Sequence, residues 1–237
     1  MKYLVCFDMD RVLVDHFSTW QFIYDKLNIS NKEAFDLYNQ GKLDEWDWLK
    51  LDLALIKQNH PTIDDAILRE MCSNMPLMAG IKECLEWIVS NNHEVAIISG
   101  GLQETAREIS LMFPSEKEWK KRWGGINRHH GRDTKFHVFT NGWLMKRDGT
   151  IEDYGRYQVQ MNGKGSIVKM LQRRLEIPKE HTIAVGDSAG DIDMFRESGL
   201  SICFNPLDEK PVLVADTTIR SSNLLDVLSV IKSKISL

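Results

Sequence analysis

The chain has 237 residues, a formal net charge of −4 and a hydrophobic fraction of 43%. These values suit a soluble globular protein with one large domain or a core with a smaller insert, and they do not indicate disorder. The charge gives no general reason to expect binding to nucleic acid or to a membrane. No apolar run reaches membrane-spanning length, and Asp8 and Asp10 interrupt the first apolar segment too early for a secretory signal.

The four cysteines are widely spaced and form no CxxC pair or other metal-binding pattern. Neither a zinc site nor a disulfide framework is therefore predicted. Cys6 and Cys203 lie in apolar runs, so we expect them to be buried as small hydrophobic residues. A reducing, cytoplasmic location fits this pattern.

The first segment carries two carboxylates at the end of an apolar run. Residues 2–7 predict a buried strand, and Asp8 and Asp10 follow it directly. In an extended chain these carboxylates point the same way and repel each other unless a cation lies between them. Hard oxygen ligands favour Mg²⁺, and an Asp beside Mg²⁺ can attack phosphorus while the second Asp acts as acid or base. The alternative is a strand followed by an acidic turn.

Residues 16–74 show apolar and aromatic side chains at helical spacing throughout. Ser30 and Glu33 are spaced as a capping box that would open the second of these helices. A third helix is predicted from about Asp44 to Gln58, and a short fourth from about Thr62 to Cys72. We expect a helical insert of about sixty residues, in which aromatic residues such as Trp20, Trp46 and Trp48 mostly form the core rather than bind a ligand.

The next segments predict a parallel α/β arrangement. A helix from Ala79 leads to a strand over Glu94–Ile98, which ends at Ser99-Gly100-Gly101 before another helix. Phosphate favours such a junction, because free backbone N–H groups and the helix dipole converge there. Glycines at a strand end are otherwise only a turn.

The segment 117–135 interleaves basic and aromatic residues. This pattern would suit a polyanion, but acidic residues dilute the charge and no nucleic-acid motif is present, so we favour a solvated surface excursion. A metal site formed by three histidines and an aspartate in or next to this segment is the less favoured alternative, because their spacing matches no standard site: His129, His130, Asp133 and His137.

A strand is predicted over Phe136–Asn141, followed by a hairpin at Arg147–Gly149. Residues 162–165 then open a helix, and Lys164 at its start is well placed to hold an anion. The strand Thr182–Val185 ends in a second acidic tip that contains Asp187 and Asp191. The remaining predicted elements are a strand at Leu200–Phe204, a strand at residues 212–215 ending at Asp216, and a helix from Asn223 to Ile235.

The polar strand ends would meet at one edge of the sheet, where open parallel sheets bind ligands. Together they form a phosphoryl-transfer site, with Mg²⁺ held by carboxylates, a hydroxyl and N–H groups on the phosphoryl oxygens, and a lysine that offsets negative charge. The residues are Asp8, Asp10, Ser99, Lys164, Asp187 and Asp191.

This set resembles the haloacid dehalogenase-like superfamily, whose four motifs correspond to Asp8-Met9-Asp10, Ser99, Lys164 and Gly186-Asp187 with Asp191. Within it the chain resembles the phosphoserine phosphatase-like branch, because a helical segment follows the first motif and Thr140-Asn141 precedes a hairpin. The resemblance implies an α/β fold with a Rossmann-like parallel sheet core, formed by residues 1–15 and 76–237, and an inserted all-helical cap domain over 16–75.

The resemblance also implies the role of each residue. Asp8 would be the nucleophile, and Asp10 the general acid and then the general base. Asp8, Asp187 and the backbone carbonyl of Asp10 would ligate Mg²⁺, with Asp191 orienting the metal site. The phosphoryl group would be held by Ser99, the Gly100 N–H and Lys164.

Two positions depart from the family pattern. Arg11 and Val12 follow Asp10 where the family usually has Gly or Ser and then Thr. Arg11 would either clasp a second anionic group of the substrate or reach into solvent. Phe17 stands where phosphoserine phosphatases place the Glu that binds the substrate amine, so phosphoserine is in doubt as the substrate.

We expect a Mg²⁺-dependent phosphatase for a small phosphorylated metabolite, with no membrane partner. Three alternatives stay open. The phosphoryl group would pass to an acceptor other than water, the fold would serve a binding or regulatory role with Arg11 blocking turnover, or the substrate would be a nucleotide or nucleic-acid end. The sequence predicts no oligomeric state.

Overall fold

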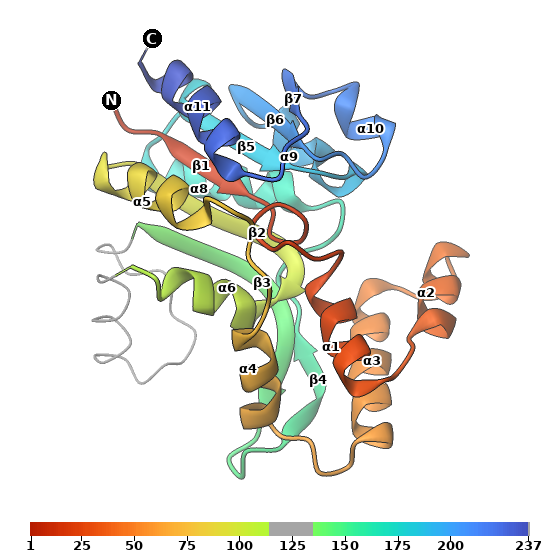
Figure 1. Cartoon of the computed structure of the whole chain (residues 1–237). Helices are drawn as coiled ribbons and strands as arrows, with labels where there is room; N and C mark the ends of the chain where they lie inside the picture. The colour runs from red at the N-terminus through yellow and green to blue at the C-terminus, as the bar shows by residue number, and fades with distance from the viewer. Residues whose placement is uncertain (114–134, 237) are drawn as a thin grey trace.

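The computed structural model describes residues 1–113 and 135–236 (Figure 1). A seven-stranded sheet has the order β4-β3-β2-β1-β5-β6-β7, and its strands are parallel apart from the antiparallel β3–β4 pair. This confirms the predicted α/β fold class. The strands are β1 (Leu4–Phe7), β2 (Glu94–Leu102), β3 (Phe136–Met145), β4 (Ile151–Arg156), β5 (Thr182–Gly186), β6 (Leu200–Phe204) and β7 (Thr217–Ile219).

The first strand lies at the centre of the sheet because it is apolar on both faces. Val5 and Phe7 join the core on one face, and Leu4 and Cys6 join the core on the other. The first face packs under α5 (Ile81–Ser90), α6 (Gln103–Ser110) and α11 (Leu224–Ile235), and the second under α8 (Lys164–Leu175) and α9 (Ile192–Arg196). The residues directly after β1 are thereby fixed at the middle of one sheet edge.

Four helices separate β1 from α5, as the apolar spacing predicts: α1 (Thr19–Leu27), α2 (Lys32–Asn39), α3 (Glu45–Asn59) and α4 (Asp65–Ser73). In Figure 1 they gather around the β3–β4 hairpin, at the end of the molecule away from both termini. The predicted capping box is wrong, because α2 begins at Lys32 with Asn31 as its N-cap and no side-chain cap. Ser30 thus lies one residue outside the capping position.

Two predicted strand boundaries also differ. β2 does not end at Ile98 but continues to Leu102, with a shift in its register to β3 between Ser99 and Leu102. The stretch from Val212 is not a strand, because Asp208 accepts a hydrogen bond from the Lys210 N–H and starts α10 (Glu209–Val212). The strand that pairs with β6 is β7, further along the chain.

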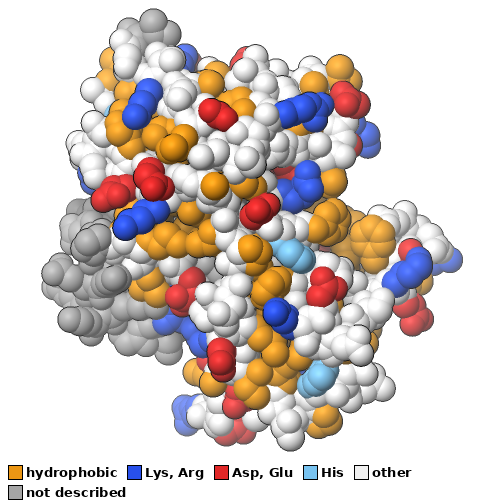
Figure 2. Space-filling model, in the orientation of Figure 1, with side chains coloured by type: hydrophobic (Ala, Val, Ile, Leu, Met, Phe, Trp, Pro, Cys, Tyr) orange, Lys and Arg blue, Asp and Glu red, His pale blue; other side chains and the backbone are white. Residues whose placement is uncertain are grey.

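The hairpin, the helix that starts at Lys164 and the C-terminal helix are confirmed. All four cysteines are buried and free, as expected for Cys6 and Cys203. Among the described residues, no helix combines the length and the apolarity needed to cross a bilayer. Figure 2 shows acidic and basic side chains interspersed on the visible face, with no continuous basic stripe among the residues described there.

Residues 117–134 of the basic segment lie outside the described residues, and with them His129, His130 and Asp133 of the considered metal site. His137 is described. It is buried in β3, and its Nε2 lies 2.8 Å from Glu94 Oε2 on the neighbouring strand.

Candidate active site

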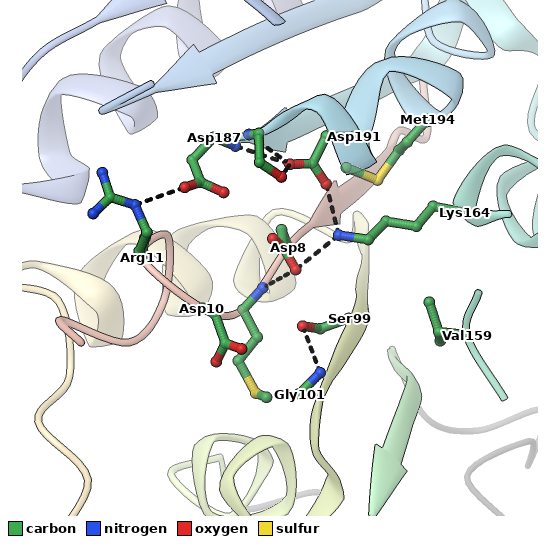
Figure 3. Close-up of polar contacts among 12 residues, drawn as sticks. Asp8, Asp10, Arg11, Ser99, Gly101, Val159, Lys164, Asp187, Asp191 and Met194 are labelled. Atoms are coloured by element: carbon green, nitrogen blue, oxygen red, sulfur yellow. Dashed lines mark hydrogen bonds and ion pairs between the residues drawn. The ribbon is translucent and has the colours of Figure 1, made fainter. Parts of the chain in front are cut away.

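The sheet topology brings the two acidic strand ends together. β5 pairs directly with β1, and the Asp8 N–H continues the ladder by donating to the Val185 carbonyl at 2.9 Å. Asp8 and Asp187 therefore leave the sheet side by side (Figure 3). The Asp8 side chain is anchored by the Met9 N–H, which donates to Oδ1 at 2.7 Å.

Lys164 joins the two acidic segments. Its Nζ lies 2.9 Å from Asp8 Oδ1 and 2.6 Å from Asp191 Oδ1, and all three side chains are buried. Burial by itself lowers the pKa of a lysine, but Asp191 and Asp8 outweigh it and raise the pKa of Lys164 above its ordinary value. The lysine thus stays charged, and its position at the start of α8 confirms the predicted element that carries it.

Asp191 is fully buried and is held by the turn that follows β5. Its Oδ2 accepts hydrogen bonds from the N–H groups of Asp187 and Ser188 and from the Ser188 hydroxyl. Gly186 makes this turn possible, since a Cβ there would lie 2.3 Å from Asp191 Cγ. With Oδ2 occupied by the turn, Oδ1 is directed to Lys164.

The side chains of Asp8, Asp187 and Asp191 each offer an oxygen within 4.8 Å of the other two. Burial, and then the neighbouring carboxylates, raise the pKa of Asp187 to about 8, against the opposing effect of Arg11. Burial is also the main cause that raises the pKa of Asp8. Adjacent buried carboxylates with raised pKa values are the donor set that a hard divalent cation binds and ionises, so these residues fit a divalent metal.

Asp10 points away from this group (Figure 3). Its Oδ1 accepts a hydrogen bond from the Thr19 N–H at 3.0 Å. Burial and the nearby Asp8 raise the pKa of Asp10 to about 7, while Thr19 counteracts them. A carboxyl group with such a pKa can give up and take back a proton near neutral pH.

The structure shows where the side chain of Arg11 lies, for which the sequence left two alternatives. It adopts a left-handed backbone conformation with φ 61°, its Nε donates to Asp187 Oδ2 at 2.7 Å, and its Nη2 donates to the Asn205 carbonyl at 2.9 Å. The alternative in which Arg11 only reaches into solvent is therefore wrong. A pocket of about 350 Å³ lies beside it, lined by Arg11, Asp15, His16, Phe17, Met78 and Asn205.

Phe17 lines this pocket and is 59% exposed. Ser99 is buried in β2 beside Asp8 and Lys164, and its hydroxyl oxygen accepts from the Gly101 N–H at 3.1 Å. The structure thus brings Asp8, Ser99, Lys164, Asp187 and Asp191 to one place, with Asp10 and Arg11 on either side.

Sequence reasoning missed two residues at this site. The indole Nε1 of Trp20 donates to the Gly100 carbonyl at 3.2 Å, and Thr19 contacts both Asp10 and Leu102. Helical spacing placed Trp20 among core residues, and only the position of these residues just after the first motif hinted at another role. Trp46 was also expected in the core, but it is 40% exposed and its ring contacts Tyr157.

Comparisons with known proteins agree with this geometry. A model of the haloacid dehalogenase-like hydrolase family matches residues 4–199. A phosphoserine phosphatase of Methanocaldococcus jannaschii is 27% identical over 98% of both chains, and one of Wolinella succinogenes is 26% identical over 80% of both. A solved structure of a substrate-bound phosphoserine phosphatase shares the fold with a TM-score of 0.71, at 23% identity over 97% of this chain and 98% of that chain.

The family match covers most of the sheet and every strand end that contributes to the site, which agrees with the motifs found in the sequence. The chain therefore belongs to the haloacid dehalogenase-like hydrolases.

Proposed function

We propose that this protein is a Mg²⁺-dependent phosphatase that hydrolyses a small phosphomonoester through an aspartyl-phosphate on Asp8. The observation that carries the proposal is the position of Asp8, which lies at the end of the central strand, 2.9 Å from the buried Lys164 and within a group of three carboxylates. The similarity to phosphoserine phosphatases over nearly the whole chain supports the same reaction class.

In this proposal the phosphoryl oxygens are held by the Ser99 hydroxyl, the Gly100 N–H and Lys164. Ser99 supports this role, because its oxygen accepts from the Gly101 N–H and it donates to no acceptor among the described residues, so its proton can be donated to an oxygen of the substrate. Lys164 offsets negative charge on both the nucleophile and the phosphoryl group.

The proposed reaction has two steps. An Asp8 oxygen forms a bond to phosphorus while the bond to the leaving oxygen breaks, and Asp10 donates a proton to the departing alcohol. Asp10 then takes a proton from water, whose oxygen attacks phosphorus and breaks the bond to Asp8, releasing inorganic phosphate. The raised pKa of Asp10, about 7, suits both proton transfers.

We assign the metal site to the side chains of Asp8 and Asp187 and the backbone carbonyl of Asp10, with Asp191 orienting the site. When bound there, Mg²⁺ supplies positive charge to the oxygens of the nucleophile and the phosphoryl group. Oxygen-only donors and a surplus of carboxylates over the two cations Lys164 and Arg11 support Mg²⁺ as the metal.

The proposed substrate is a small phosphorylated metabolite. Phosphoserine belongs in the set to be tested, because the relatives from Methanocaldococcus jannaschii and Wolinella succinogenes are named phosphoserine phosphatases. Phe17 argues against it, since an aromatic ring offers no carboxylate to the amino group of the substrate. We also propose that residues 16–75 form a cap over a core of residues 1–15 and 76–237, and that the protein is cytoplasmic, in keeping with its free cysteines.

The test is phosphate release from a panel of phosphorylated metabolites with Mg²⁺ and with a chelator. The wild type is compared with Asp8→Asn, and with Asp36→Asn as a control at an exposed carboxylate of α2. We expect one compound to be turned over by the wild type and the control but not by Asp8→Asn, with phosphate trapped covalently on the wild type. Release that persists in Asp8→Asn would contradict the proposal.

The Arg11–Asp187 ion pair favours a second candidate, a binding or regulatory protein in which Arg11 suppresses turnover. The same panel separates the two. A wild type without phosphatase activity and an active Arg11→Gly variant would establish that Arg11 suppresses turnover. Loss of activity in Arg11→Gly would exclude this second candidate. Transfer of phosphate to added alcohols in place of water would instead identify a phosphotransferase.

A further inference from the structure

The first turn of α1 lies across the end of β2. Trp20 donates from its indole Nε1 to the Gly100 carbonyl at 3.2 Å, and the Thr19 hydroxyl oxygen accepts from the Leu102 N–H at 2.9 Å. The Thr19 N–H donates to Asp10 at 3.0 Å. Two consecutive residues thus contact the phosphate-binding stretch and the proposed acid.

These contacts occur where the sheet cannot supply them. The pairing of β2 with β3 shifts between Ser99 and Leu102, so Gly100 and Gly101 have no partner in the register, and the pairing resumes only at Leu102. Buried backbone groups must still find hydrogen bonds, and α1 provides two of them. Thr19 is fully buried, which excludes solvent from its contacts.

The Trp20 bond fixes one particular peptide. The Gly100 carbonyl and the Gly101 N–H belong to the same planar unit, and the Gly101 N–H donates to Ser99 Oγ. Two glycines in succession leave this unit free to rotate unless it is held. Trp20 holds this peptide through the Gly100 carbonyl, and the Gly101 N–H of the same peptide therefore stays in place to bind the Ser99 hydroxyl oxygen. In the proposed site, the hydroxyl proton of Ser99 is donated to a phosphoryl oxygen.

The helix start also leaves one donor for Asp10. Ser18 caps α1 by accepting from the N–H groups of Trp20 and Gln21, so the Thr19 N–H is available to the Asp10 carboxylate. Space is tight at this junction. A Cβ on Gly101 would lie 2.6 Å from Thr19 Oγ1 and 2.9 Å from Asp10 Oδ2.

We propose that Trp20 and Thr19 are positioning residues of the phosphoryl site. Trp20 acts through the Gly100–Gly101 peptide on Ser99, and Thr19 acts on Leu102 and Asp10. The phosphate-binding stretch and the acid are therefore aligned only when the first turn of α1 is docked. This inference rests on the proposed function for the identity of the phosphoryl site.

The first test removes the indole N–H while keeping an aromatic ring. Trp20→Phe is compared with Trp87→Phe, which changes a tryptophan of α5 whose ring lies beside His93 and Lys232. The measurements are the dissociation constant of inorganic phosphate in the presence of Mg²⁺, by calorimetry, and kcat and KM for the compound found in the panel. We expect about tenfold weaker phosphate binding in Trp20→Phe and a matching fall in kcat/KM, with both unchanged in Trp87→Phe.

A second pair covers the case in which Trp20→Phe fails to fold. Thr19→Val removes the hydroxyl that accepts from Leu102 at nearly constant shape, and Thr19→Ser keeps it. We expect Thr19→Val to lose phosphate affinity and kcat when measured well below its own melting temperature, and Thr19→Ser to retain most of both.

The outcomes separate this inference from the proposed function. Phosphate binding and turnover in Trp20→Phe and Thr19→Val within twofold of the wild type would overturn the positioning role and leave the phosphatase intact. A wild type that neither binds phosphate nor turns over any compound would overturn both. A wild type that binds phosphate without turnover would contradict the hydrolase proposal, and phosphate affinity would still decide the positioning role.

Discussion

Arg11 and Asp187 are separated by most of the chain, yet the guanidinium Nε of Arg11 lies 2.7 Å from Asp187 Oδ2. The carboxylate is one of the three that face each other at the end of the central strands. One of its two oxygens is therefore bound to a side chain of the same protein. This ion pair offsets negative charge in the acidic cluster, and in the proposed metal site it would compete with Mg²⁺ for an oxygen of Asp187.

We expect Arg11→Gly to bind Mg²⁺ about tenfold more tightly, because it frees the Asp187 oxygen. Glycine also suits the left-handed backbone at this position, where other residues pay about 1 kcal/mol. Calorimetric titration with Mg²⁺ measures the affinity, and a chelator should lower the melting temperature of this variant more than that of the wild type. Arg11→Lys is the matched control, since it keeps the charge without the planar fork. Unchanged or weaker Mg²⁺ binding in Arg11→Gly would contradict the competition.

Gly101→Ala tests how closely β2 approaches Asp10. The new Cβ would lie 2.7 Å from Met9 Cε and less than 3 Å from atoms of Thr19 and Asp10, so these groups must move. We expect kcat/KM to fall by about a hundredfold, with a loss of about 1–3 kcal/mol in the free energy of unfolding.

Gly149→Ala is the control that separates the loss of stability from the loss of activity expected in Gly101→Ala. Gly149 has φ 92° in the β3–β4 turn and nothing near its added Cβ, so the variant should lose stability through backbone strain and keep its kcat. Equal kcat/KM values in Gly101→Ala and the wild type would show that the junction can relax.

Asp52 should make stability depend on pH. It is buried in α3, and burial raises its pKa to about 6, partly offset by the polar groups of Tyr24, Asn31 and Trp48. Because the folded state binds this proton more tightly than the unfolded state, the contribution of Asp52 to stability is present at low pH. It is lost as the pH rises from about 4 to about 6.

Asp52→Asn removes the titrating group at constant shape. The variant should be about 3 kcal/mol more stable than the wild type above pH 7, and the difference should vanish near pH 3. Urea denaturation of both proteins across this range measures it. A difference that stays constant with pH would show that Asp52 does not titrate in this window.

A buried polar contact joins α4 to the sheet. Trp143 in β3 donates from Nε1 to Asp65 Oδ1 at 2.8 Å, and Arg69 pairs with both Asp65 and Glu104 of α6. A double-mutant cycle of Asp65→Ala and Trp143→Phe should give a coupling of about 1–2 kcal/mol in the free energy of unfolding. For the remote pair Asp65→Ala and Trp87→Phe, the changes in the free energy of unfolding should be additive. Additivity in the first cycle as well would exclude a net contribution from this hydrogen bond.

The sequence predicted those parts of the fold that depend on local pattern. The apolar run before Asp8 and the turn after Thr182–Val185 identified the two acidic strand ends, since burial on both faces demands such runs. Helix starts were less predictable. Ser30 and Glu33 had capping-box spacing, but α2 begins at Lys32 and has no side-chain cap.

The strand predicted at residues 212–215 shows the same limit. An apolar run of four residues is typical of a strand, yet Asp208 caps a short helix there, and Leu213 is 83% exposed. Short apolar segments are ambiguous by periodicity alone. The extension of β2 to Leu102 was likewise hidden, because glycines at Gly100 and Gly101 are typical of a turn.

The sequence by itself determined which polar strand ends and helix starts lie together, because parallel strands joined by helices must present their carboxyl ends at one edge. It placed Asp8, Ser99, Lys164, Asp187 and Asp191 in one site. Only the tertiary structure decided that Arg11 binds Asp187 and that Trp20 holds Gly100. These contacts join residues far apart in the chain, and they depend on where whole helices and loops pack, which no local pattern of side chains specifies.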